Sequence, residues 1–188
     1  MIKLAEKLNK KYGTKATVIG RRTKMSNNLI ELTQKIEQWA EDRNLHTADP
    51  IKQYDKLIEE FGELMKGINK QDIDMIKDSI GDMYVVLVIM SKQTGSSVVD
   101  LLKDGRMDTL RPKHSTFSYV DCLFSLSESV TLREYEIIHD VEDIKRELAK
   151  TCGEYYLDFT DCVALAYNEI KDRKGKMIDG KFVKEADL

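Results

Sequence analysis

The chain has 188 residues, which is enough for one ordinary domain or for one domain with an added subdomain. Hydrophobic residues make up 41% and charged residues 34%, so the chain can bury a core beneath a strongly charged surface. The formal net charge of −3 excludes a protein that is cationic as a whole and argues against a nucleic-acid partner.

The sequence carries no sign of a membrane or secreted protein. Its longest apolar run, 83–90, is too short to span a bilayer, and no secretory signal stands at the N-terminus. The three cysteines, Cys122, Cys152 and Cys162, include no C-x-x-C pair, which argues against a disulfide framework or a structural zinc site. We therefore expect a cytoplasmic protein with no membrane partner.

The first stretch, 1–28, reads as a basic N-terminal extension. Within it, the β-branched run 17–19 is compatible with a short strand. Ser26, followed by two asparagines, is typical of a helix N-cap region. This predicts that the first long helix begins close to residue 29.

Three long helices are predicted next, over 29–44, 50–68 and 72–93, from apolar residues at three- and four-residue steps. Asp49 and Pro50 suit the N-cap and first position of the second of these helices. The run 84–89 could be a buried strand by propensity, but we favour helix because no breaker interrupts the pattern before Gly95.

The rest of the chain also predicts helices. Residues 96–155 form an insertion, with helices expected over 98–103, 117–130 and 132–152. A last helix is expected over 158–174, capped by Gly175 and followed by a polar tail, 176–188. The expected fold class is all-α, a helical bundle with a helical insertion.

Five carboxylates are the most informative feature. Glu59, Glu60 and Glu63 share one side of their helix, and Asp78 and Asp82 share one side of the next. Folding the two helices back at the turn between them brings Glu60 level with Asp82. Carboxylates that converge in a partly buried site repel one another unless a cation lies between them. All-oxygen ligands suit Mg²⁺ or Mn²⁺, whereas the bland alternative is a solvated acidic face.

The segment Glu59-Glu60-Phe61-Gly62-Glu63, followed after a turn by Ile80-Gly81-Asp82-Met83-Tyr84, resembles the MazG-like all-α nucleoside triphosphate pyrophosphohydrolases. Their signature is E-E-x-x-E and then E-x-x-D. The first helix resembles theirs over 36–45, and the end of the chain resembles that of the short phage-encoded members over 166–177. The likeness spans a domain made of 29–95 and 156–188. Ser79 stands where the family has its second-motif Glu, which implies a weaker metal site.

The resemblance implies an enzyme that hydrolyses a nucleoside triphosphate, with a deoxynucleoside triphosphate favoured, to the monophosphate and pyrophosphate. Mg²⁺ or Mn²⁺ would be held by Glu60, Glu63 and Asp82 with Asp78 nearby, and Glu59 would be the general base. It also implies a homo-oligomer, a dimer or tetramer. Phosphate or sugar contacts would come from the last helix, at Asn168, Lys171, Arg173 and Lys174.

Other interpretations stay open. Trp39 can stack on a base or pack in the core, and Arg43, one turn later, can reach a base edge or a phosphate. The cations at the end of the last helix also suit its macrodipole without any ligand. His139 with Asp140 is typical of HD phosphohydrolases, and Glu136-x-x-His139 is half of a di-iron motif. The alternative function is a non-catalytic module that binds a nucleotide or a partner on the same scaffold.

Overall fold

The structure is a computed structural model that describes residues 15–103, 118–132, 137–178 and 181–185. Within these ranges the side chains at 15–27 and 176–184 fall outside the description. The elements in chain order are α2 (Lys15–Asp42), η1 (Leu45–Thr47), α3 (Pro50–Lys70), α4 (Ile73–Gln93), α5 (Val98–Lys103), α6 (Ser118–Leu132), α7 (Ile138–Glu154), α8 (Phe159–Ile170), β1 (Gly175–Ile178) and β2 (Lys181–Lys184).

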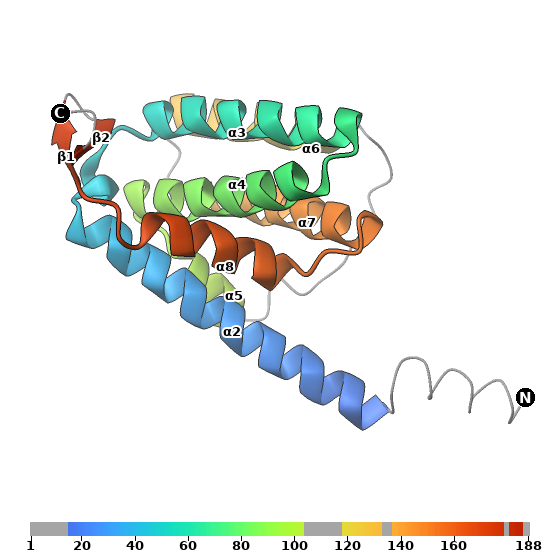
Figure 1. The fold of residues 1–188 in the computed structure, drawn as a ribbon. Coiled ribbons are helices and arrows are strands. Elements are labelled where there is room, and N and C mark those ends of the chain that lie inside the picture. Colours follow the sequence, from blue (N-terminus) through green and yellow to red (C-terminus); the bar gives the residue numbers. More distant parts are fainter. Residues whose placement is uncertain (1–14, 104–117, 133–136, 179–180, 186–188) are drawn as a thin grey trace, which may run out of the picture.

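The architecture is all-α, as the sequence predicts, with one small strand pair at the C-terminal end (Figure 1). Helix α4 lies at the centre, and α3, α8, α2 and α7 all contact it. In Figure 1, α3 and α6 form one layer, α4 and α7 the next, and α8 and α2 the third.

The helical hairpin of α3 and α4 confirms the predicted arrangement. Asp49 caps α3 by accepting a hydrogen bond from the Ile51 amide at 3.0 Å, and Pro50 occupies the first turn. The turn is made at Gln71, whose φ of 56° reverses the chain. The run 84–89 is helical, so the strand alternative for it is wrong. Its six residues are buried on every side, which explains why they lack the polar positions of an amphipathic helix.

The beginning of α2 corrects the sequence interpretation of the basic extension. Helix α2 runs from Lys15 through Asp42, so 17–19 is helix rather than strand, and Ser26 lies inside the helix rather than at its N-cap. The physical reason is that Lys, Arg, Ala and Met are good helix formers and that one glycine, Gly20, is not enough to end a helix. Residues 1–14 lie outside the described part.

The C-terminal end also differs from the prediction. Helix α8 ends at Ile170 rather than at 174, and Gly175 begins β1 instead of capping a helix. Strands β1 and β2 pair antiparallel, with Met177 opposite Phe182. The polar character of the tail 176–188 alone does not predict this strand pair. The signal for it is Asp179-Gly180, a favoured hairpin dipeptide, between two short runs that carry apolar residues.

The insertion packs onto the bundle through described side chains. The short helix expected at 98–103 is present as α5, and α6 and α7 confirm two further helices, of which α7 begins at Ile138. Residues 104–117 and 133–136 lie outside the description. Tyr54 of α3 donates a hydrogen bond to the Leu123 carbonyl of α6 at 2.9 Å. Helices α2 to α8 contribute to one continuous hydrophobic core.

Tyr84 shows how the centre of that core is specified. Its side chain is fully buried, and its hydroxyl shares a hydrogen bond with the Thr33 hydroxyl of α2 at 2.8 Å. The ring also meets Phe159 of α8 edge-on, with centroids 5.2 Å apart. One residue of α4, two positions after Asp82, therefore fixes both α2 and α8.

A candidate carboxylate site between three helices

The α3 side of the site is built around Glu60. This residue is only 5% exposed, and its carboxylate lies 2.6 Å from the Lys56 ammonium, one turn earlier on the same helix. Lys56 also contacts Glu59 at 3.1 Å. Burial raises the pKa of Glu60, the Lys56 charge lowers it, and the negative charges of Glu63 and Glu59 raise it further. The three carboxylates of α3 are therefore close enough to influence one another electrostatically, as their spacing predicts.

The α4 side is built around Asp82. The pKa of Asp82 is raised from its ordinary value of 3.8 to about 7, first by burial and then by the negative charges of Glu60 and Asp78. The pKa of Asp78 is raised as well, first by burial and then by the charges of Glu169 and Glu63. Across the hairpin, the charge of Glu60 therefore acts on Asp82 and the charge of Glu63 acts on Asp78.

Helix α8 adds a carboxylate that the sequence interpretation missed. The negative charge of Glu169 raises the pKa of both Asp78 and Asp82, so its charge acts on both aspartates. Arg173, just after the helix, opposes this by lowering both, and its guanidinium lies 3.5 Å from the Glu169 carboxylate. The available signal was that Glu169 stands within the same short run as the predicted phosphate contacts, four residues before Arg173.

Gly81 explains how α8 comes so close to α4. A Cβ placed on Gly81 would lie 2.3 Å from the Cys162 carbonyl oxygen and 2.9 Å from the Ala166 side chain. Only glycine fits at this crossing, which is one residue from Asp82. Around Gly62, by contrast, a Cβ would meet no described atom within 4 Å. The two glycines of the predicted motifs therefore differ, because Gly81 serves helix packing and Gly62 leaves open space.

The fit of a divalent cation rests on the donor set. Among the described residues, no group of three or more Asp, Glu, His or Cys side chains is arranged so that it could hold a metal ion as it stands. The Lys56 ammonium lies on Glu60 in the place of a counter-cation. The donors are nevertheless all oxygen and mutually repelling, which is the chemistry that Mg²⁺ or Mn²⁺ relieves. Glu60, Asp78 and Asp82 are buried or half-buried, whereas Glu63 is exposed. Glu60 would have to release Lys56 before it could bind such an ion.

The hydroxyl of Ser79 indicates, independently of the carboxylates, that a hydrogen-bond partner is missing at this site. It is 1% exposed, and its hydroxyl makes no hydrogen bond with any residue that the structure describes. A buried hydroxyl without a partner costs about 1–3 kcal/mol, so such a group usually serves water or a ligand. Ser79 lies one turn from Asp82 on the same side of α4.

We predict that Ser79→Ala leaves the free energy of unfolding of the ion-free protein unchanged or raises it by about 0.5–2 kcal/mol, because it removes an unpaired buried hydroxyl. Urea unfolding in the presence of a chelator measures this. A loss of more than about 1 kcal/mol would mean that the hydroxyl has a stabilising partner. Val99→Ala, which deletes buried methyl groups elsewhere, is the control that should lose stability.

Trp39 and Arg43 lie together at the end of α2. Trp39 is 8% exposed, and the Arg43 guanidinium lies 4.6 Å from the centre of its ring. Arg43 donates hydrogen bonds to the Arg173 carbonyl at 2.9 and 3.2 Å. Both residues thus tie the segment after α8 to α2. Their direct contact with a base or a phosphate stays a prediction.

The remaining predicted contacts lie at the end of α8. Asn168 and Lys171 are exposed, and the Lys171 ammonium donates a hydrogen bond to the Asn168 side chain at 3.1 Å. Lys174 is exposed after the helix. Because α8 ends at Ile170, Arg173 and Lys174 follow its C-terminal end, where the macrodipole also favours cations.

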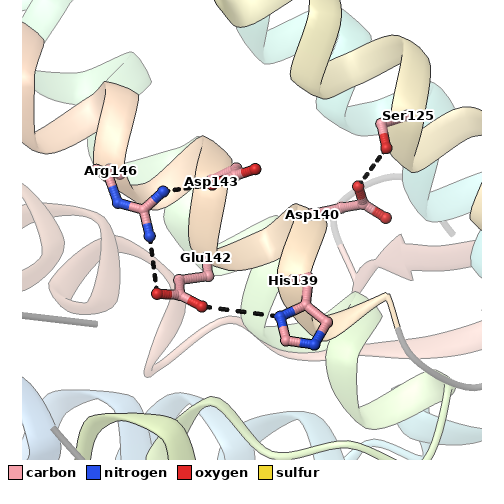
Figure 2. Close-up of polar contacts among 6 residues, drawn as sticks. All are labelled: Ser125, His139, Asp140, Glu142, Asp143 and Arg146. Carbon is pink, nitrogen blue, oxygen red and sulfur yellow. Dashed lines mark hydrogen bonds and ion pairs between the residues drawn. The ribbon is translucent and has the colours of Figure 1, made fainter. Parts of the chain in front are cut away.

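The competing motif at His139 has ordinary structural partners. Figure 2 shows His139 beside Glu142 and Asp140 reaching Ser125 of α6. Asp140 accepts hydrogen bonds from Ser125 at 2.6 Å and Ser129 at 2.8 Å, so it joins α7 to α6. His139 is exposed, and Glu136 lies outside the described part. These contacts give the His139-Asp140 pair a packing role.

Comparison with known proteins gives little beyond this geometry. None of the helices in the described part combines the length and apolar character that a bilayer crossing requires. No model of a known protein family matches the chain, and no solved structure matches it. The chain is similar to an uncharacterized 18.2 kDa protein from the rep-hol intergenic region of Haemophilus phage HP1, with 58% identity over 67 residues. That match covers 35% of this chain and 41% of the phage protein, less than two thirds of either.

Proposed function

We propose that the protein is a MazG-like nucleoside triphosphate pyrophosphohydrolase that depends on Mg²⁺ or Mn²⁺. The observation that carries the proposal is the cluster of desolvated carboxylates around Asp82, formed by Glu60 of α3 with Asp78 and Asp82 of α4, next to the exposed ion pair of Glu169 and Arg173. A structural ion-pair network would pair these carboxylates with as many cations. Here burial and repulsion instead raise the pKa of three of them.

A bound divalent ion supplies Lewis acidity, charge neutralisation and a lowered pKa for a water molecule. Glu60, Glu63 and Asp82 would hold it, with Asp78 and Glu169 beside them. Glu59 is exposed and only linked to Lys56, so it is free to take a proton from the attacking water as general base. The water attacks the α-phosphorus. The bond from this phosphorus to the oxygen that bridges it to the β-phosphate then breaks, which releases pyrophosphate.

The phosphate side of the proposal rests on Lys171, Arg173 and Lys174. A triphosphate carries several negative charges next to a site that is already acidic, so it needs cations on its far side. Arg173 already sits within the field of Asp78 and Asp82, and the hydrogen bonds from Arg43 fix its backbone. A homo-oligomer, a dimer or tetramer, would add further walls around the nucleotide.

The test is pyrophosphate release from canonical ribo- and deoxynucleoside triphosphates with and without Mg²⁺. We expect metal-dependent release of pyrophosphate and the monophosphate, with at least one deoxynucleotide among the substrates. Release of inorganic phosphate alone, or no turnover with any nucleotide, would contradict the proposal. Nucleotide binding without turnover would favour the second candidate, a non-catalytic binding module, which Ser79 in place of the family Glu supports.

We predict that Lys171→Ala and Arg173→Ala each lower kcat/KM by about ten- to a hundredfold, because a hydrogen bond to a charged phosphate is worth roughly 1.5–3 kcal/mol. Steady-state kinetics with an accepted triphosphate measure the loss. Lys35→Ala, which removes an exposed lysine of α2, is the matched control and should change little. If all three variants behave alike, the basic segment after α8 does not bind the triphosphate.

A further inference from the structure

Two cysteines from neighbouring helices face each other inside the protein. Cys152 lies near the end of α7 and Cys162 in the first turn of α8, and their sulfur atoms are 3.9 Å apart. They are 2% and 0% exposed. The third cysteine, Cys122, is half-buried on α6. Two thiols in direct contact are a separate feature from the carboxylate site, and nothing in the proposed hydrolysis uses them.

We propose that Cys152 and Cys162 are a redox modification site, at which a hydroperoxide converts the two thiols into an intramolecular disulfide that links α7 to α8. The inference stands independently of the proposed hydrolase activity. It needs only the contact between the two sulfur atoms and an oxidant small enough to reach them.

Cys162 is the sulfur that reacts first. The two thiols share a hydrogen bond, which lowers the Cys162 pKa, and the positive charge of Lys77 lowers it further. The same contact and burial raise the pKa of Cys152. The position of Cys162 in the first turn of α8 also favours a thiolate, whereas the carboxylates of Asp158 and Asp161 oppose it.

The chemistry balances in two steps. The Cys162 thiolate attacks one oxygen of hydrogen peroxide, the O–O bond breaks, and a sulfenic acid and hydroxide form. The Cys152 sulfur then attacks the Cys162 sulfur, the S–O bond breaks, and the proton of the Cys152 thiol leaves with the departing hydroxide as water. In sum, two thiols and one hydrogen peroxide give one disulfide and two water molecules.

The fold allows the sulfur atoms to close the remaining gap. A disulfide bond is about 2.05 Å long, so the two atoms must approach by roughly 2 Å. Both cysteines stand near helix ends, joined by the short turn 155–158, in which Tyr156 is 97% exposed. Helix ends open more easily than helix centres, which gives peroxide access and lets the side chains adjust.

The test treats the full-length protein with hydrogen peroxide, removes the peroxide, blocks remaining thiols with iodoacetamide under denaturing conditions, and maps peptides without reduction. We expect one linked peptide pair that joins Cys152 to Cys162 and has lost two hydrogens, while Cys122 carries the alkyl group. Dithiothreitol should restore both thiols. Cys122→Ser should keep the link, and Cys162→Ala should abolish it.

Three results would overturn the proposal. In the first, Cys152 and Cys162 both remain fully alkylated at peroxide levels that oxidise Cys122. In the second, Cys162 accumulates as sulfinic acid without any link to Cys152. In the third, the linked peptides join Cys122 to another cysteine. Because the wild-type protein itself gives the decisive map, the conclusion does not depend on whether a cysteine variant folds.

Discussion

Asp82→Asn is expected to abolish metal-dependent hydrolysis and, at the same time, to stabilise the ion-free protein. A bound metal ion is worth several kcal/mol in the transition state, so the loss of a ligand should lower turnover by roughly 10²–10³-fold. The stabilisation follows from the burial of Asp82, whose pKa is raised to about 7. At pH 8 the folded protein must hold this carboxylate charged and poorly solvated, and asparagine removes that cost.

The pH dependence has a definite sign. Between the ordinary pKa of 3.8 and the folded value of about 7, folded Asp82 binds a proton that the unfolded chain has released. The contribution of Asp82 to the free energy of unfolding therefore falls as the pH rises through this window. At about 1.4 kcal/mol per pKa unit, and with partial exposure weakening the effect, asparagine should gain on the order of 2–4 kcal/mol at pH 8. The gain should vanish as the pH falls towards 4.

Urea unfolding of both proteins at pH 4 and pH 8, with a chelator present, measures this difference. Added Mg²⁺ should stabilise the wild type at pH 8, because the ion binds only the folded state, and should not stabilise the asparagine variant. Asp74→Asn, which changes an exposed aspartate in the first turn of α4, is the matched control and should gain nothing. Full turnover in the Asp82 variant, or a loss of stability at pH 8, would contradict the assignment.

Much of the site geometry could be predicted because residues that are equally far from the turn of a helical hairpin lie level with each other. Glu60 and Asp82 are equally far from the turn at Gln71, so the antiparallel packing of α3 and α4 brings them together without any further information. The caps at Asp49 and Pro50 were equally predictable, since each satisfies a local rule that tertiary contacts rarely override.

Contacts between segments that are far apart in the sequence could not be predicted by counting residues from a turn. Glu169 reaches the site only because α8 crosses α4 at Gly81, and no spacing in the sequence reveals that crossing. The early end of α8 goes together with another such contact, in which Arg43, just after α2, donates a hydrogen bond to the Arg173 carbonyl. The salt bridge from Lys56 to Glu60, by contrast, follows from their spacing of four residues on one helix.

Gly81→Ala and Gly62→Ala are expected to change stability in opposite directions, although both replace a glycine inside a long helix. At Gly62 the new methyl group meets nothing within 4 Å, so alanine should stabilise α3 by about 0.5–1 kcal/mol. At Gly81 it would lie 2.3 Å from the Cys162 carbonyl oxygen. A backbone carbonyl cannot swing aside as a side chain can, so α8 must move, at a cost of about 1–3 kcal/mol or more.

This pair of variants also separates packing from catalysis. Displacing α8 carries Glu169 and Arg173 away from Asp82, so Gly81→Ala should lose hydrolysis together with stability, as seen by parallel turnover assays and thermal unfolding. Gly62→Ala keeps the three helices in place, and its turnover reports whether the open space beside Glu63 admits the substrate. A stabilised Gly62 variant with reduced turnover would place the nucleotide against that part of α3. A Gly81 variant as stable as the wild type would mean that α8 does not pack on α4 as closely as this contact requires. That result would also contradict the placement of Glu169 and Arg173 near Asp82.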